Sequence, residues 1–407
     1  MKVLHIGTNA GGGGAAIAMR RHCEAMRRVG IDAKILALYG NEDNMTIVYP
    51  KKKWSTILLY CKQRVVNLFI KLIKKPGIMS WEDKNFDLSI IHEINDADII
   101  YIHWINGFLS VSSIKYLLSQ RKPIIWYMHD MWPITGGCHH SLNCSNYESD
   151  CTNCKRLRIF KQIPSLILKK KVDFLQGYDN LYLAAPSIWL TRCISQSAMF
   201  KGNKVFNIPN IIDTDFFKPM DKIICRNRYN IPNKKIVLFS AVHLGDIYKG
   251  AEYLIEVISR IEDSRVDFVV VGNCDLKIFP KKIRNRIHIL GYLTSQHDMV
   301  QAYNVADVLL TTSMADNFPN VVIEAMACSI PVIGFATGGI KDQINHKVNG
   351  WITEQKNISG LLEGINWVLF DSNYSSLQKA ARNYVIECCS YQNVEKIHAP
   401  LLNLVNK

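Results

Sequence analysis

The sequence predicts an α/β protein made of two domains, each built on a parallel sheet. The chain has 407 residues, and at roughly 150 residues per domain this length suggests two or three domains. Short buried-strand runs alternate with segments of helical apolar spacing in both halves, which is the pattern of parallel sheets. Each half also begins with a strand that leads through a glycine-containing loop into a helix.

Composition and charge limit the setting in which the protein works. The hydrophobic content is 48% and the formal net charge is +14. That charge calls for an acidic partner, such as nucleic acid, an anionic lipid surface or a diphosphate-bearing substrate. No apolar run reaches the roughly 18 to 20 residues that span a bilayer, and the start resembles no secretion signal. The 12 cysteines are therefore expected to be mostly reduced thiols in a cytoplasmic protein.

The first strand-loop-helix unit carries a glycine-rich loop. Lys2 to Ile6 reads as a buried strand, and Gly7 to Gly14 follows it before the helical pattern begins. The loop fits the dinucleotide pattern G-x-G-x-x-A, but the next strand ends in Tyr39 and Gly40 rather than in an acid. NAD binding is therefore disfavoured. The same loop also suits a tight turn that lets a helix pack on its strand.

Residues 54 to 75 predict an amphipathic helix with a basic side. Lys51 to Lys53 precede it, and a second basic run lies between Lys155 and Lys171. Such a helix either lies on an anionic membrane surface or packs its apolar face into the core with its basic face in solvent. Its apolar face consists of Trp54, Leu58, Cys61, Val65, Leu68 and Leu72.

Two later strands end in residues that can face a cleft. Asp98 to Ile102 leads into His103, and Ile124 to Met128 leads into His129 and Asp130. Ligands of parallel sheets bind at the carboxyl ends of strands, although a histidine at a strand end is also often a hydrogen-bonded structural residue. His103 and Asp130 are the weaker candidates for cleft residues. We assign them to the side of the cleft that would bind an acceptor substrate.

A polar loop over residues 136 to 154 gathers four cysteines. Two of them form the half-site Cys151-x-x-Cys154, whose spacing is normal for zinc. No second Cys-x-x-Cys completes the pattern, so free or redox-active thiols are the alternative. The expected ligands of a structural zinc are Cys138, Cys144, Cys151 and Cys154.

The domain boundary is placed in a polar stretch after residue 218. The predicted first domain covers residues 1 to 218 and the second covers 219 to 385, while residues 386 to 407 form a final helix that returns to the first domain. The second domain opens with the strand Ile236 to Val242, and Lys249-Gly250 follows just before a helix. A lysine there is either a phosphate ligand or a solvated residue.

The region from Ser313 to Gly339 reads as strand, loop, helix, strand and glycine pair. Asp316 lies in the loop and Glu324 lies about one turn into the helix. Acids in these places can accept hydrogen bonds from sugar hydroxyls, and the free N–H groups at the helix start suit an anion or a hydroxyl. The alternative makes Asp316 an N-terminal cap and Glu324 a solvated helix residue.

This region resembles the signature of retaining glycosyltransferases of family 4. Members of that family have the GT-B fold, in which two Rossmann-like domains face each other across a cleft. The order in the family is an acid, seven residues, a second acid that opens Glu-Ala-Met-Ala, then Pro-Val and Gly-Gly. The matching residues are Asp316, Glu324, Ala325, Met326, Ala327, Pro331, Val332, Gly338 and Gly339.

The resemblance implies a role for each candidate residue. Glu324 holds the ribose of a sugar nucleotide, Asp316 and His129 contact the donor sugar, and Lys249 binds the donor diphosphate. Two departures stand out, since the first acid is commonly Glu and an arginine usually precedes the lysine. The other donor-binding residues are Gly13, Gly14, Phe318, Pro319, Asn320, Gly338 and Gly339.

The expected function is transfer of a hexose-type sugar from a nucleotide-sugar donor to a lipid-linked or other saccharide acceptor. The resemblance extends to bacterial enzymes of surface polysaccharide synthesis, including lipopolysaccharide and capsule, some of which have a cysteine-bearing loop. It implies no catalytic metal and a cytoplasmic protein at the inner face of the membrane. A sugar-nucleotide epimerase of the same fold is the enzymatic alternative. A basic nucleic-acid-binding protein is disfavoured because no such module is present.

Overall fold

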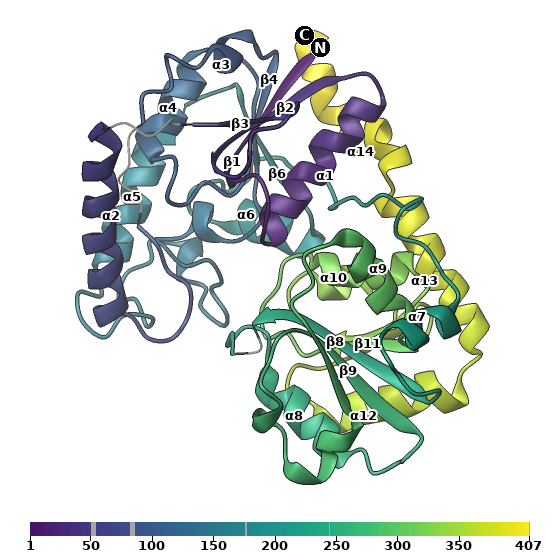
Figure 1. Ribbon diagram of the computed structural model, residues 1–407. Coiled ribbons are helices and arrows are strands. Elements are labelled where there is room, and N and C mark those ends of the chain that lie inside the picture. The colour runs from purple at the N-terminus through teal and green to yellow at the C-terminus, as the bar shows by residue number, and fades with distance from the viewer. Residues whose placement is uncertain (50–53, 82–85, 176, 244, 407) are drawn as a thin grey trace. The chain divides into compact units, whose positions relative to one another are not determined.

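The structure is a computed structural model that describes residues 1–49, 54–81, 86–175, 177–243 and 245–406. Its chain divides into two compact units: unit 1 is Met1–Ile211 with Tyr391–Lys407, and unit 2 is Ile212–Ser390. Both are parallel α/β units, so the predicted fold class is confirmed (Figure 1). The division falls earlier than residue 218 and later than residue 385. The reason is a contact between residues far apart in the sequence, because the two connecting segments pair with each other: the Ile212 N–H donates to the Cys389 carbonyl at 2.7 Å.

Unit 1 is built on a parallel sheet in the order β3-β2-β1-β4-β5-β6-β7. The order reverses between β1 and β4, which makes the carboxyl ends of these two strands a topological switch point. The strands are β1 Lys2–Asn9, β2 Asp32–Tyr39, β3 Thr46–Val48, β4 Ile99–Ile102, β5 Ile124–Tyr127, β6 Leu181–Ala185 and β7 Val205–Asn207.

Helices cover both faces of this sheet because successive strand residues point to opposite sides. In β1, Leu4 and Ile6 pack in the same cluster as residues of α4 and α6, whereas Val3 packs with α1 and α14. Figure 1 shows the returning helix α14 beside α1. The helices are α1 Gly14–Arg28, α2 Trp54–Ile73, α3 His92–Asp96, α4 Val111–Ser119, α5 Ile163–Leu175, α6 Ile188–Gln196 and α14 Val394–Leu402.

Unit 2 repeats the same plan with the strand order β10-β9-β8-β11-β12-β13. Its order reverses between β8 and β11, and all of its paired strands are parallel. The strands are β8 Lys235–His243, β9 Val266–Asn273, β10 Ile287–Gly291, β11 Val308–Thr311, β12 Val332–Phe335 and β13 Gly350–Thr353.

The helices of unit 2 also form two layers. α9, α10 and α13 contribute to the cluster on one face, and α8 and α12 contribute to the cluster on the other. A single π turn, Trp367–Asp371, follows α12. The helices are α7 Lys222–Arg228, α8 Ala251–Arg260, α9 Gln296–Asn304, α10 Asn320–Ala327, α11 Ile340–Gln343, α12 Ile358–Asn366 and α13 Tyr374–Cys389.

The helix α2 does not bury the face that its sequence pattern marks as apolar. Its buried side chains are Gln63, Ile70 and Ile73, whereas those of Cys61 and Val65 are exposed, as are Leu68 and Leu72. The alternative in which that face packs into the core therefore does not hold for these four residues. The side chains of Trp54 and Leu58, and residues Lys51 to Lys53, lie outside the described part.

None of the helices in the described ranges is long and apolar enough to cross a membrane.

Candidate active site

The strand order of unit 2 brings three candidate loops together. β8, β11 and β12 are neighbours in the sheet and run parallel, so the loops at their carboxyl ends meet at one edge. Lys249 follows β8, Asp316 follows β11 and Gly338 follows β12. The structure therefore gathers residues that are almost 90 positions apart in the chain.

Lys249 and Asp316 form an ion pair in this cluster. Lys249 Nζ lies 2.6 Å from Asp316 Oδ2, with the lysine side chain 32% exposed and the aspartate side chain 17% exposed. Burial by itself lowers the pKa of Lys249, but the charge and hydrogen bond of Asp316 outweigh it and raise that pKa. The ammonium is therefore fixed in its charged form beside a carboxylate that remains partly open to solvent.

Glycines allow the backbones of the three loops to approach closely. Gly250 and Gly338 both have positive φ, at 62° and 54°. A Cβ on Gly338 would lie 2.0 Å from the Asp316 carbonyl oxygen, and one on Gly250 would lie 2.2 Å from the Thr312 oxygen. The Gly339 N–H donates to that same Asp316 carbonyl at 3.2 Å. The position of Asp316 thus depends on glycine at residue 338.

Glu324 is buried rather than solvated. Its side chain belongs to α10, and the residue is only 6% exposed. The Tyr303 hydroxyl, from α9, donates to Glu324 Oε2 at 2.6 Å. This bond fixes the carboxylate, and it excludes the alternative of a solvent-facing helix residue. Tyr303 was missed in the sequence because it sits at an ordinary apolar position of a helix.

The start of α10 does not fit the alternative in which Asp316 is an acidic cap. The N-cap residue is Pro319, and no side chain caps the helix. Phe318 and Asn320 are also buried, at 6% and 9% exposure. Asp316 is therefore free of a capping role and is held instead by Lys249 and by its own backbone. Contacts of Phe318, Pro319 and Asn320 with a donor stay predictions.

In unit 1, the glycine-rich loop connects β1 to α1 at the switch point. Gly13 is the N-cap of α1 with φ 83°, and Gly12 has the same φ. Gly13 and Gly14 are exposed, and a Cβ on Gly13 would meet nothing within 4 Å. The glycine at 13 is therefore required by backbone conformation, while the space beside it is open.

His129 is the outermost member of a chain of three histidines. Its Nε2 lies 2.9 Å from His103 Nδ1, and His103 Nε2 lies 2.9 Å from His5 Nδ1. Burial lowers the pKa of His129 to about 4, although Asp130 acts in the opposite direction. His103 is 3% exposed, and both of its ring nitrogens are engaged. It is therefore in no position to bind an acceptor directly, and it supports His129 instead.

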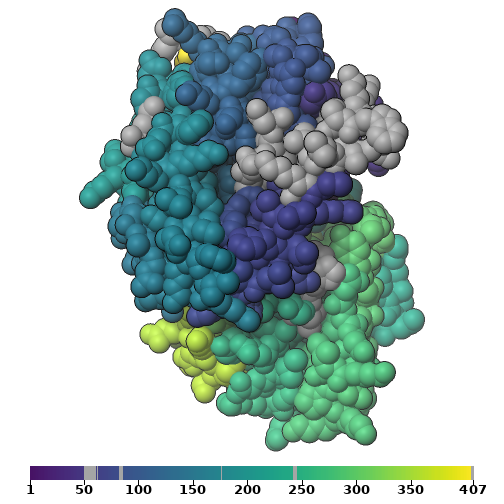
Figure 2. Space-filling view, turned by 90° about the vertical axis from the view of Figure 1, so that its left-hand side faces the viewer, coloured from purple at the N-terminus to yellow at the C-terminus, as the bar shows by residue number. Residues whose placement is uncertain are grey.

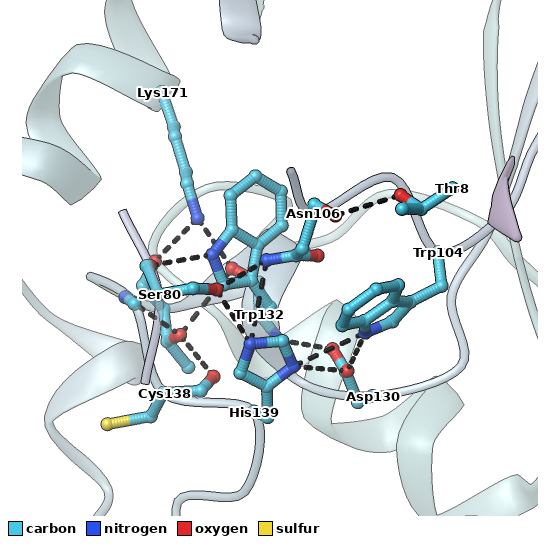
Figure 3. A network of polar contacts seen from close by, with 11 residues as sticks. Thr8, Ser80, Trp104, Asn106, Asp130, Trp132, Cys138, His139 and Lys171 are labelled. Carbon is cyan, nitrogen blue, oxygen red and sulfur yellow. Dashed lines mark hydrogen bonds and ion pairs between the residues drawn. The ribbon is translucent and has the colours of Figure 1, made fainter. Parts of the chain in front are cut away.

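Asp130 points into a separate buried network (Figure 3). Its Oδ2 lies 2.6 Å from His139 Nδ1 and accepts a hydrogen bond from Trp104 Nε1 at 2.8 Å. His139 Nε2 lies 2.8 Å from Ser80 Oγ. Asp130 Oδ1 also accepts from the Trp132 N–H. The carboxylate thus joins the end of β5 to the loop at 136–154, which gives it a structural role.

The loop at 136–154 does not present a ready metal site. Among the residues that the structure describes, no three His, Cys, Asp or Glu side chains lie together so that they could hold a metal ion. Cys138 and Cys154 hydrogen-bond to each other, and this bond lowers the pKa of Cys154 below its ordinary value. The four cysteines do not fit a preformed zinc site here, and the zinc stays a prediction.

Comparison with known proteins agrees with this geometry. Residues 221–385 match the family model of glycosyl transferases group 1. An uncharacterized glycosyltransferase of Methanocaldococcus jannaschii is 24% identical over 94% of this chain and 92% of its own length. The matched family supports a glycosyltransferase.

Solved structures identify the fold as GT-B. The Anabaena protein HepE in complex with UDP-glucose superposes with a TM-score of 0.67 over 99% of this chain and all of that one, at 17% identity. A lipopolysaccharide outer core galactosyltransferase, WaaB, gives a TM-score of 0.58 over 98% of this chain and 99% of its own, at 14% identity. The chain therefore has the two-domain glycosyltransferase fold that its sequence predicted.

Proposed function

We propose that this protein transfers a sugar from a nucleotide-sugar donor to a saccharide acceptor and retains the anomeric configuration, as family 4 enzymes do. The observation that carries the proposal is the pairing of Lys249 with Asp316 at 2.6 Å. It lies at the switch point of the unit that matches the glycosyl transferase family.

The pair suits the charge that develops in the reaction. Cleavage of the glycosyl–phosphate bond builds negative charge on the leaving diphosphate, and a fixed cation beside it lowers the barrier. When a donor binds, its phosphates form an ion pair with the ammonium of Lys249 in place of Asp316. The carboxylate of Asp316 is then released from its ion pair and can accept hydrogen bonds from hydroxyls of the donor sugar. The Gly338 and Gly339 backbone lies against the backbone of Asp316.

Glu324 and His129 complete the proposed donor contacts. The buried carboxylate of Glu324 is held by Tyr303 on one oxygen, and we assign it to the ribose hydroxyls of the nucleotide because it matches the second acid of the family signature. His129 is neutral at neutral pH because burial lowers its pKa to about 4, so it acts on the sugar as a hydrogen-bonding group rather than as a charge. It belongs to unit 1.

The acceptor that we propose is a lipid-linked saccharide of bacterial surface polysaccharide synthesis, such as lipopolysaccharide or capsule. The net charge of +14 suits a diphosphate-linked lipid in an anionic membrane. The name of WaaB among the structural neighbours is in keeping with this acceptor class.

The donor site is tested by removing its cation. Lys249→Ala should lower the rate of transfer by about 100-fold or more, because the leaving phosphates lose their fixed charge. Transfer is measured with a donor found by thermal-shift screening of a nucleotide-sugar panel. Lys282→Ala removes an exposed lysine far from these loops and should leave the rate unchanged.

Two outcomes would contradict the proposal. If Lys249→Ala transferred the sugar at an unchanged rate, the ion pair would have no role in the reaction. Conversion of the donor to an isomer without any acceptor would identify an epimerase instead. Glu324→Gln keeps the hydrogen bond with Tyr303 and should weaken donor binding with little loss of stability.

A further inference from the structure

The helix α2 presents an uncovered apolar face to solvent. Val65, Leu68 and Leu72 are 69%, 60% and 68% exposed, and their spacing of three and four residues places them on one side of the helix. The opposite side already supplies Ile70 and Ile73 to a buried cluster with Leu157. The exposed residues are therefore not needed for the core, and an apolar face of this kind marks an interaction site.

The segment that follows the cysteine loop extends this face. The Arg158 N–H donates to the Ile73 carbonyl at 2.8 Å, so residues 156 to 160 are fixed against the end of α2. Phe160 is 47% exposed, Ile159 is 54% exposed and Leu166 of α5 is 63% exposed. Figure 2 shows the dark blue atoms of α2 beside the teal atoms of this region. We call these residues the apolar face: Val65, Leu68, Phe69, Leu72, Ile159, Phe160 and Leu166.

Phe160 is held in a conformation that its residue type disfavours. Its φ is 55°, in the left-handed region that bulky side chains rarely enter. The ring lies 5.9 Å from that of Phe69, which is itself 39% exposed. An exposed aromatic side chain on a strained backbone is a feature of functional surfaces, and here it enlarges the apolar face.

The two segments that carry most of the apolar face contain charges of one sign only. Residues 54 to 75 and 155 to 172 contain no Asp or Glu. Apart from the buried Lys171, most of their described basic side chains lie at the surface, so cations flank the aliphatic and aromatic groups. The exposed members are Arg64, Lys71, Lys75, Lys155, Arg158, Lys161, Lys169 and Lys170.

We propose that the apolar face docks on an anionic phospholipid bilayer. The aliphatic and aromatic side chains enter the boundary between headgroups and acyl chains, and the surrounding cations bind the phosphates of the headgroups. A second copy of this chain fits less well because two such faces repel each other. Nucleic acid fits less well because aliphatic side chains offer no stacking to bases. The inference deepens the proposed function, since a lipid-linked acceptor lies in a bilayer.

Vesicle flotation tests the docking directly. The full chain should float with vesicles of equimolar phosphatidylglycerol and phosphatidylcholine and much less with pure phosphatidylcholine. A variant that combines Val65→Ser, Leu68→Ser and Leu72→Ser should bind the anionic vesicles at least about tenfold more weakly. Lys71→Gln with Arg64→Gln should lose about fivefold for each charge removed.

A matched control separates this face from exposed apolar residues in general. Ile223 and Ile224 of α7 are each 67% exposed, and Ile223→Ser with Ile224→Ser should leave flotation unchanged. Thermal shift with the donor should be equal in all variants, which distinguishes failure of docking from failure of the donor site. Flotation of the triple variant like that of the unchanged protein would overturn the proposal. A dimer that the triple variant converts to monomer would overturn it as well, in favour of self-association.

Discussion

At the scale of single residues, the histidine chain determines which nitrogen of His129 carries its proton. Each of the two bonds in the chain holds one hydrogen, so all three neutral rings must donate in the same direction. If they donate inward, His5 Nε2 carries an N–H, and this buried atom has no partner among the described residues. A buried orphan N–H is rarer than a bare acceptor. The chain therefore donates outward, and His129 bears its proton on Nδ1.

This arrangement makes His103 a positioning residue. His103→Phe should lower the rate of transfer about tenfold with little change in the KM for the donor, because His129 loses the bond that orients its ring. His103→Asn can place an amide N–H near the position of Nδ1 and should recover part of the loss. Nitrogen NMR of the imidazoles would show His129 losing its single Nδ1–H tautomer in the Phe variant. An unchanged tautomer would contradict the assignment.

The sequence predicted some of these site residues and missed others, depending on whether a local pattern marks them. Lys249, Asp316 and Glu324 stand in a contiguous motif or just before a helix, where local pattern is informative. Tyr303 and His5 sit inside a helix and a strand among apolar neighbours, and only the folded chain shows that each is hydrogen-bonded to a site residue.

At the scale of elements, the loop after β12 depends on one glycine. Gly338→Ala should destabilise unit 2 by about 2 kcal/mol or more and weaken donor binding, because the new Cβ would displace the backbone of Asp316. Gly291 also has positive φ, at 73°, but nothing lies within 4 Å of its Cβ position. Gly291→Ala should therefore cost only the strain of the φ angle, about 1 kcal/mol. Urea unfolding and thermal shift with the donor measure the two effects, and equal losses in both variants would refute the clash.

The helix α2 shows what periodicity can and cannot predict. The pattern predicted a helix over residues 54 to 75, and the structure has it over Trp54–Ile73. It marked one apolar face and left open whether that face packs into the core, whereas the structure buries Ile70 and Ile73 of another side. That choice is made by contacts with Leu157, which lies 84 positions after Ile73 and 87 positions after Ile70 in the chain.

At the scale of the whole molecule, buried histidines should make unit 1 sensitive to acid. Burial lowers the pKa of His5, His129 and His398 to about 3, 4 and 3, and it lowers those of His22 and His103 as well. Such groups take up protons only on unfolding, so stability is complete above their unfolded pKa of about 6.5 and falls below it. At pH 5.5, each of these histidines should lower the free energy of unfolding by about 1.4 kcal/mol.

The measurement is the free energy of urea unfolding between about pH 7.5 and pH 5. His398→Phe removes one of these groups, which faces Tyr101 and His22, and should reduce the slope by one proton. His297 is exposed, and His297→Ala should leave the slope unchanged. A slope that is the same in all three proteins would exclude the histidines as its cause.

The sequence predicted two parallel α/β domains because alternation of strands and helices is a local signal repeated along the chain. It misplaced the boundary because the connecting segments are set by pairing between residues far apart. Ile212 and Cys389 are far apart in the sequence and are hydrogen-bonded to each other. No local sequence pattern indicates this contact.

The same crossing imposes an order on synthesis. Helix α14 contributes Val394 and Leu401 to the core of unit 1, and His398 Nε2 lies 2.9 Å from His22 Nδ1. A ribosome delivers these residues only after all of the intervening unit has emerged. Unit 1 therefore cannot complete its core until α14 has emerged, and until then one face of its sheet stays uncovered. Unit 2 can fold before that point. Nascent chains halted before residue 394 should keep that flank open to chaperones.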